Sequence, residues 1–220
     1  MVMMMRVKVC GIRRSEDAAL AVELGASALG FIFWPSSPRF VDPDAAQAII
    51  ATVPPFVSTV GVFVDQDAAH VAEVARALKL TAVQLHGSEQ VDAYGGAAPQ
   101  VVKAIPVGED GSAERLVRAL PARVGVLLDA HDPVKRGGTG RTIDWTRAAA
   151  LARMRPIILS GGLNADNVGN AIDAVRPYAI DVSSGVESQP GVKDAGKLRA
   201  FFSALDHTAK HRKAQLHESN

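Results

Sequence analysis

The sequence has 220 residues, of which 48% are hydrophobic and 21% are charged, a balance typical of a soluble globular protein. Its 24 basic and 23 acidic side chains leave a formal net charge of +1, which argues against a nucleic-acid surface or a membrane-binding face. One cysteine cannot form an internal disulfide, and the short apolar start MVMMM lacks the pattern of a signal peptide. We therefore expect a soluble, cytoplasmic protein.

Short β-rich runs alternate with segments of helical spacing along the chain. The expected strands are Val7–Cys10, Ala28–Phe33, Val57–Val64, Ala82–His86, Gln100–Ile105, Val124–Asp129, Pro156–Ser160 and Ala179–Ser184. The expected helices are Ser15–Leu24, Pro43–Ala51, Asp67–Leu78, a short piece around Ser88–Tyr94, Ser112–Leu120, Asp144–Arg153, Asn164–Val175 and Asp194–Leu205. Ser15 with Asp17, and Asn164 with Asn167, stand where helix caps belong.

Eight β/α units without a linker predict a single-domain (β/α)8 TIM barrel, an α/β fold, over residues 1–205. The strands are mostly apolar without strict alternation, as expected of parallel strands covered by helices. A doubly wound open sheet is the alternative, but it usually has fewer strands and a glycine-rich turn after the first one. Residues 206–220 are charged and lack an apolar face, so we expect a frayed helix end or a disordered tail.

A barrel of this kind carries its active site at the carboxyl ends of the strands. Five chemically capable side chains stand at those ends or in the loops that follow: Cys10, Arg39, His86, Asp129 and Asp181. The glycine-dense segment 135–141, KRGGTGR, follows the sixth strand, and we expect it to fold over a bound ligand.

Small residues fill the loops after the last two strands, in LSGGLN and DVSSGVE. In phosphate-binding barrels these two loops present backbone N–H groups and a helix N-terminus to the anion. Tight structural turns would explain either loop alone, but the pair favours a phosphate site and a phosphorylated, sugar-like substrate. The expected phosphate-binding residues are Gly161, Gly162, Ser183, Ser184 and Gly185.

Three residues have more than one interpretation. Asp129 ends an apolar strand, where a turn cap, a metal ligand and a proton donor are all conceivable; apolar surroundings favour the protonated acid. A metal is least favoured, because the histidines show no ligand pairing on one barrel element. Cys10 is either a small buried residue or a reactive thiolate that needs nearby positive charge. Arg39, in WPSSPRFV, is either a surface side chain or a clamp for a carboxylate.

Seven segments occur in an order that resembles a known family: KVCGI, GFIFWPSSPRFV, GVFVD, VQLHGSE, LLDA with GGTGRTIDW, LSGGLNADNV and DVSSGVESQPGVKD. Together, from Val7 to about Phe202, they are similar to the phosphoribosylanthranilate isomerases of tryptophan biosynthesis. The resemblance implies an Amadori rearrangement of N-(5-phospho-β-D-ribosyl)anthranilate to 1-(2-carboxyphenylamino)-1-deoxy-D-ribulose 5-phosphate. It implies no metal and no organic cofactor. The sequence leaves both a homodimer and a monomer open.

The same resemblance implies roles for individual residues. Asp129 would be the general acid that opens the sugar ring, and Cys10 the general base that removes the proton from C2. Arg39 would bind the anthranilate carboxylate, and Gly162 with the segment Ser183–Gly185 the phosphate. Asp181 and His86 would line the substrate pocket.

Three departures from the family pattern are Arg13, where threonine is common, Ile143, where phenylalanine is usual, and Ser160, where alanine is frequent. Three other functions remain open. A histidine-pathway isomerase on the same barrel would be expected to carry aspartate in place of Cys10. A catalytically silent phosphosugar-binding barrel would bind ligand without turnover, and a metal-dependent epimerase would lose activity with a chelator.

Overall fold

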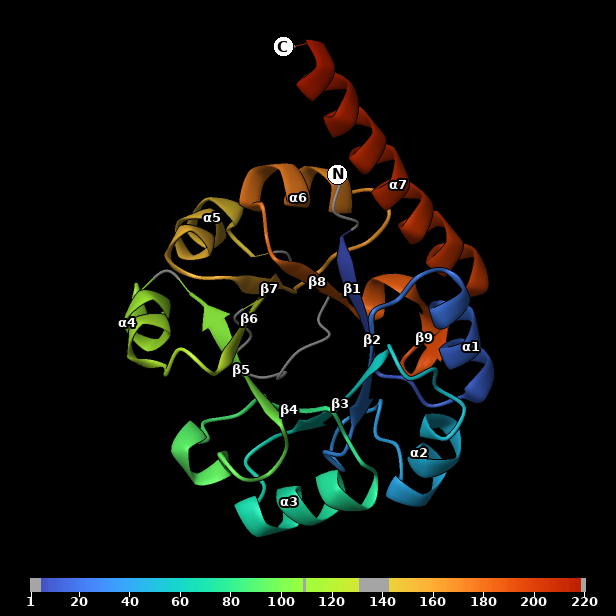
Figure 1. Ribbon diagram of the computed structural model, residues 1–220, viewed down its shortest axis with the longest axis vertical. Coiled ribbons are helices and arrows are strands. Elements are labelled where there is room, and N and C mark those ends of the chain that lie inside the picture. The colour runs from blue at the N-terminus through green and yellow to red at the C-terminus, as the bar shows by residue number, and fades with distance from the viewer. Residues whose placement is uncertain (1–4, 109, 131–142, 219–220) are drawn as a thin grey trace.

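The computed structural model describes residues 5–108, 110–130 and 143–218, with side chains up to Lys210. Eight parallel strands form a closed barrel in chain order, and the last strand pairs with the first (Figure 1). The strands are β1 (Arg6–Cys10), β2 (Ala28–Ile32), β3 (Ser58–Phe63), β4 (Ala82–Leu85), β5 (Gln100–Val107), β6 (Gly125–Ala130), β7 (Ile157–Leu159) and β8 (Ala179–Val182). The predicted (β/α)8 barrel is confirmed, and the open sheet is excluded because the strands close on themselves.

A ring of helices covers the outside of the barrel (Figure 1). They are α1 (Ser15–Glu23), α2 (Pro43–Ile50), α3 (Ala68–Ala77), α4 (Ser112–Ala119), α5 (Trp145–Met154), α6 (Val168–Val175) and α7 (Ala195–Glu218). Three helices begin at aspartates that accept a backbone N–H from the first turn: Asp42, Asp67 and Asp144. Each side chain satisfies a donor that the helix itself leaves unpaired.

Local details differ from the sequence prediction where tertiary contacts compete with caps. Asp17 does not cap α1 but lies buried and binds Arg14. Asn164 and Asn167 bind each other's backbone in the turn before α6, which shortens that helix. The segment after β4 forms only the 3₁₀ helix η1 (Val91–Tyr94).

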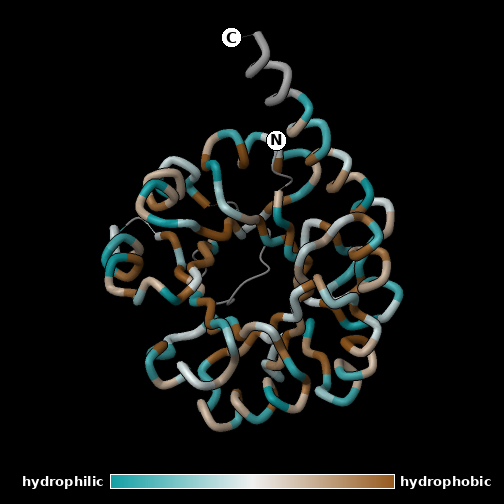
Figure 2. The backbone as a smooth tube through the Cα atoms, in the orientation of Figure 1, coloured by the Kyte–Doolittle hydropathy of each residue, from teal (hydrophilic) through white to brown (hydrophobic). Residues whose placement is uncertain are grey.

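Hydrophobic side chains of the strands and of the inner helix faces form one core cluster. Figure 2 shows hydrophobic segments along the strands and more hydrophilic ones on the outer sides of the helices. The apolar area removed from water here contributes roughly 25 cal/mol per Å² to folding. In β1, Val7 and Val9 belong to this cluster and the alternating Lys8 and Cys10 do not, so the cluster lies between the strands and the helices and the other strand side chains face the barrel interior.

The chain after β8 contains features that the sequence prediction lacked. The 3₁₀ helix η2 (Ser184–Val186) leads into an antiparallel pair, β9 (Glu187–Gln189) and β10 (Val192–Lys193). Helix α7 continues past the expected boundary at Leu205 to Glu218 and extends beyond the barrel (Figure 1). Its later turns are rich in Ala, Lys, Arg and Gln, which are strong helix formers. No helix among the described residues is long and apolar enough to cross a membrane.

Candidate active site

A cavity of about 410 Å³ opens at the carboxyl ends of the barrel strands. Six of the predicted site residues line it: Cys10, Arg39, His86, Asp129, Asp181 and Ser183. They come from the ends of β1, β4, β6 and β8 and from the loop after β2, so barrel closure alone brings them together. The volume suits a small organic molecule with one or two charged groups.

The thiol of Cys10 lies beside a buried ion pair. Lys8, two residues earlier on the same face of β1, donates from Nζ to Asp181 Oδ1 at 2.8 Å. In β2, a Cβ placed on Gly30 would lie 2.8 Å from Cys10 Sγ and 3.0 Å from Lys8 Cε. The thiol and the end of the lysine are therefore neighbours across the space that this glycine leaves free. Ser160 Oγ, 3.3 Å from Asp181 Oδ2, completes the cluster.

The surroundings of Cys10 act on its pKa in both directions. Burial raises the pKa of the thiol, Asp181 raises it further, and the ammonium groups of Lys8 and Lys193 oppose both. Burial would lower the pKa of Lys8, but Asp181 and Cys10 outweigh it and the pKa is raised, so Lys8 stays charged. A thiolate at this position therefore depends on the lysine beside it.

On β6 and β4, Asp129 and His86 form the second polar group of the cavity. His86 Nε2 lies 3.1 Å from Asp129 Oδ2, and the backbone N–H of Ala130 donates to Oδ1 at 2.9 Å. The amide nitrogen of Gln84 lies 2.9 Å from His86 Nδ1; with that amide as donor, Nε2 carries the hydrogen directed at Asp129. The carboxyl group is thus held in one orientation, facing the cavity.

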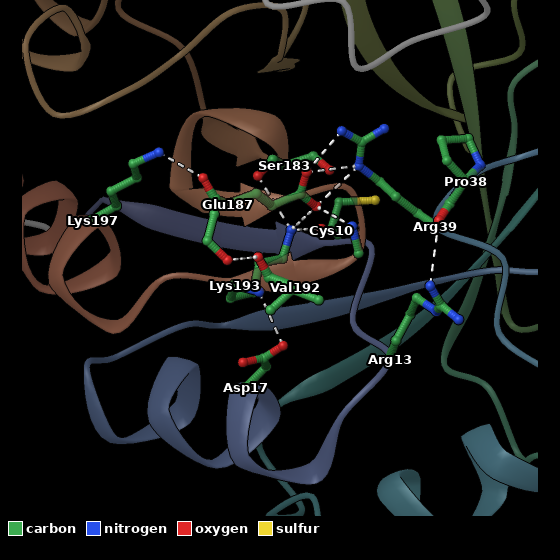
Figure 3. A network of polar contacts seen from close by, with 12 residues as sticks. Cys10, Arg13, Asp17, Pro38, Arg39, Ser183, Glu187, Val192, Lys193 and Lys197 are labelled. Atoms are coloured by element: carbon green, nitrogen blue, oxygen red, sulfur yellow. Dashed lines mark hydrogen bonds and ion pairs between the residues drawn. The ribbon is translucent and has the colours of Figure 1, made fainter.

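Arg39 is buried and held by an acidic partner. Its Nε and Nη2 atoms donate to the carboxylate of Glu187, with the shortest distance 2.8 Å (Figure 3). Lys193 binds the same carboxylate at 2.8 Å. Burial would raise the pKa of Glu187, but Arg39 and Lys193 outweigh it and hold it below the usual range.

The two phosphate-loop candidates contribute unequally to the cavity. Ser183 lines it with a buried hydroxyl that has no protein partner among the described residues. Gly161, Gly162, Ser184 and Gly185 do not line it. Both glycines after β7 have positive φ angles, 91° and 63°, a backbone conformation that favours glycine. These glycines let the chain turn directly after Ser160, which lines the cavity.

Several residues of the site were missed by the sequence prediction. Gln84 and Lys8 each precede a predicted residue by two positions on the same strand face, so the two-residue period of a strand was a usable signal. Glu187 and Lys193 lie in the segment VSSGVESQPGVKD, where only their burial in the folded chain marks them.

The glycine-dense segment 135–141 lies outside the described residues. No group of three or more metal-ligating side chains occurs in the described part of the chain.

Fold and site together define a barrel enzyme that acts on a small molecule. A thiol, two carboxyl groups and an arginine of the protein surround its cavity. The family model for N-(5'-phosphoribosyl)anthranilate (PRA) isomerase matches residues 7–204. The chain belongs to this family. It is an isomerase of tryptophan biosynthesis, as the sequence resemblance implies.

Similar proteins agree over nearly the whole length. The N-(5'-phosphoribosyl)anthranilate isomerase of Geobacter metallireducens is 49% identical over 199 residues, which cover 90% of this chain and 98% of that protein. The crystal structure of the enzyme from Thermotoga maritima has a TM-score of 0.85 at 42% identity and covers 93% of this chain and 100% of its own. Another structure from that organism describes monomers generated from a dimeric enzyme, with a TM-score of 0.79 at 39% identity, 93% of this chain and 100% of its own.

One solved relative contains a ligand. It is a phosphoribosylanthranilate isomerase in complex with reduced 1-(o-carboxyphenylamino)-1-deoxyribulose 5-phosphate. This structure has a TM-score of 0.82 and 39% sequence identity. The match covers 93% of the present chain and 100% of that relative. That ligand carries a phosphate and an aromatic carboxylate.

Proposed function

We propose that the cavity performs the Amadori rearrangement of phosphoribosylanthranilate by general acid–base catalysis, with Asp129 as acid and Cys10 as base. Asp129 protonates the furanose ring oxygen, the C1–O bond breaks, and the anthranilate nitrogen takes the positive charge as a Schiff base. The Cys10 thiolate then removes the proton from C2, and the electron pair moves to that nitrogen. The resulting enolamine tautomerises to the ketone.

One observation supports this assignment above the others: the two groups come from different strands and face the same cavity. The first step needs a protonated acid and the second needs a deprotonated base, and each such group contributes roughly 10²–10⁴-fold to a rate. His86 orients the acid, and Lys8 supplies the positive charge that a thiolate needs. The Schiff-base nitrogen is itself the electron sink, so the proposed route uses no metal and no organic cofactor.

The two ends of the substrate have matching groups in this proposal. Arg39 binds the anthranilate carboxylate, since an arginine fork suits a planar carboxylate. The loops after β7 and β8, with Gly161, Gly162 and the segment Ser183–Gly185, bind the phosphate. The buried hydroxyl of Ser183 has no hydrogen-bond partner in the described part of the chain, which supports this assignment. Asp181 lines the cavity and binds Lys8.

A turnover assay tests the acid–base pair. Phosphoribosylanthranilate is generated in situ and its fluorescence loss is followed with EDTA in every sample. We expect EDTA-resistant turnover by the parent, and a rate lowered roughly 10²–10⁴-fold in both Cys10→Ala and Asp129→Asn. Undiminished activity in Cys10→Ala would return that residue to the role of a small core side chain.

The proposed assembly is a homodimer in the cytoplasm. The dimeric description of the Thermotoga maritima relative supports the dimer, and the lone cysteine of the sequence supports a reducing compartment. Phe56, in the turn between α2 and β3, is 99% exposed and follows two prolines. Its exposure supports a subunit interface on the amino-terminal face of the barrel, and in this proposal the cavity at the opposite face stays open.

A further inference from the structure

The side chain of Arg39 has very little freedom in this structure. Its Nε donates to both oxygens of Glu187, at 3.0 and 3.1 Å, and its Nη2 donates to Oε2 at 2.8 Å. Both side chains are buried, with exposed fractions of 9% and 4%. The remaining nitrogen, Nη1, makes no hydrogen bond within the described residues. One edge of the guanidinium is therefore fixed by protein while Arg39 still lines the cavity.

Glu187 is itself fixed by a second cation. Lys193 Nζ donates to Glu187 Oε1 at 2.8 Å, to the carbonyl of Cys10 at 2.6 Å and to the carbonyl of Ser183 at 3.2 Å (Figure 3). These three bonds use every donor of the ammonium group. Arg39, Glu187 and Lys193 together carry one net positive charge, so the paired arginine remains attractive to an anion.

The backbone around this triad is also tied down. Asp17 of α1 accepts the backbone N–H of Lys193 at 3.1 Å, and Lys197 of α7 donates to the carbonyl of Glu187 at 2.7 Å. Glu187 begins β9 and Lys193 ends β10, so both stand on one short hairpin. A guanidinium held in this way has already lost its rotamer freedom before a ligand arrives, which lowers the entropic cost of binding.

We propose that Glu187, held by Lys193, is a positioning residue that orients Arg39 toward the carboxylate of the substrate. This inference rests on the proposed role of Arg39. It assigns a function to the hairpin β9–β10, which does not itself supply a proton-transfer group. Because Lys193 also binds the carbonyl of Cys10, the same hairpin fixes the distance between the carboxylate clamp and the proposed base.

A pair of ligands separates positioning from general structural support. The first is the reduced product analogue with its aromatic carboxylate, and the second is the same molecule with phenyl in place of carboxyphenyl. Binding of each to the full chain is measured by calorimetry. In Glu187→Gln the amide can no longer accept from both nitrogens of the fork, so we expect roughly 10–100-fold weaker binding of the carboxylated ligand. The ligand without a carboxylate should bind within about twofold of the parent.

Glu89→Gln is the matched control, because Glu89 also pairs with a buried lysine, Lys103, at 2.7 Å and does not line the cavity. It should leave the affinity for both ligands unchanged. Glu187→Asp keeps the negative charge, but its side chain is one methylene shorter and places the carboxylate farther from Arg39. It should give a smaller loss, again confined to the carboxylated ligand, and it serves as the test variant if Glu187→Gln fails to fold by circular dichroism.

Arg39→Met separates the carboxylate-binding role of Arg39 from the positioning role of Glu187. If Arg39→Met weakens both ligands equally, the carboxylate role of Arg39 fails and the inference fails with it. If Arg39→Met discriminates between the ligands but neither Glu187 variant does, Arg39 keeps its role and only the positioning function is overturned. Tighter binding of the carboxylated ligand by Glu187→Gln would also overturn it, because charge alone would then explain the effect of Glu187.

Discussion

At the scale of single residues, the charge of Lys8 opposes the effect of burial on the pKa of the Cys10 thiol. Cys10 is 5% exposed, and burial raises the pKa of its thiol, whereas a general base must lose its proton. Lys8 lies on the same strand face, and Asp181 holds its ammonium group in place. The lysine is therefore the group whose removal should affect the thiol most.

We expect Lys8→Met to raise the pKa of the Cys10 thiol above its value in the parent. The substitution removes the opposing positive charge and leaves Asp181 as an unpaired negative neighbour, and both changes disfavour the thiolate. The sequence has one cysteine and two tyrosines, so ultraviolet thiolate absorbance followed against pH reports this group once the titration of Cys10→Ala has been subtracted. Lys103→Met, which removes another buried lysine with a carboxylate partner, should leave the thiol titration unchanged.

The pH dependence of turnover should follow the same group. Because burial raises the pKa of the Cys10 thiol in the free enzyme, kcat/KM should increase with pH on a limb whose midpoint lies above about 8.5, the usual value for cysteine. In Lys8→Met this limb should move to still higher pH. A limb that stays in place while the measured thiol pKa moves would show that Cys10 is not the base.

The sequence predicted site residues where a simple rule applied, and missed them where the rule was geometric. Cys10 and Asp129 follow from the position of barrel active sites at strand ends. Asp181 was also predicted, but its partner Lys8 was missed: the two side chains bind each other across 173 residues of sequence, and only closure between β1 and β8 makes them partners. In the sequence, nothing distinguishes Glu187 from a surface glutamate. Only the folded hairpin β9–β10 brings its carboxylate to Arg39.

At the scale of elements, the loops after β7 and β8 are packed against each other by backbone. A Cβ on Gly185 would overlap the carbonyl oxygen of Leu163. That contact joins η2 to the segment after β7, and a backbone atom cannot rotate away as a side chain would. The two small-residue segments in the sequence are therefore one structural unit.

Gly185→Ala should separate these loops. We expect a loss of about 2 kcal/mol or more in the free energy of unfolding, because the backbone must shift to remove the overlap. Affinity for inorganic phosphate, measured by calorimetry, should fall as well if the loops bind the phosphate group. Gly96→Ala introduces the same methyl group where nothing lies within 4 Å, so it should alter neither quantity.

Element boundaries show where sequence patterns stop being informative. The eight strands and seven of the helices lie close to their expected positions, because a long alternation of apolar runs leaves few choices. The hairpin β9–β10 has only five residues in its strands, too few for any periodicity. Asp17 was expected as a cap, but its carboxylate is used by Arg14 and by the backbone of Lys193.

At the scale of the whole molecule, the barrel separates its two faces by function. The cavity opens at the carboxyl ends of the strands, and the α-to-β turns lie at the amino ends. Phe56 is exposed at the second of these faces, and burial of this side chain against a second subunit would remove apolar surface from water.

We expect the parent protein to elute as a dimer in size-exclusion chromatography with light scattering, and Phe56→Ser to shift it toward monomer. Turnover per chain in the isolated monomer should stay close to that of the parent, because the cavity is formed within one chain. Leu116→Ser, on α4, removes another exposed apolar side chain and should leave the mass unchanged. A monomeric parent would remove the dimer from the proposal.

The pairing of β1 with β8 also determines when, during synthesis, the enzyme can begin to work. Cys10 is synthesised well before Lys193, whose ammonium group binds its carbonyl and which lies 183 residues later in the chain. At roughly 5–20 residues per second, about ten seconds or more pass between the synthesis of Cys10 and the synthesis of Lys193. We therefore expect the proposed catalytic centre to form only after the β9–β10 hairpin has been synthesised, and a chain stopped before that hairpin should lack activity however well its earlier strands are formed.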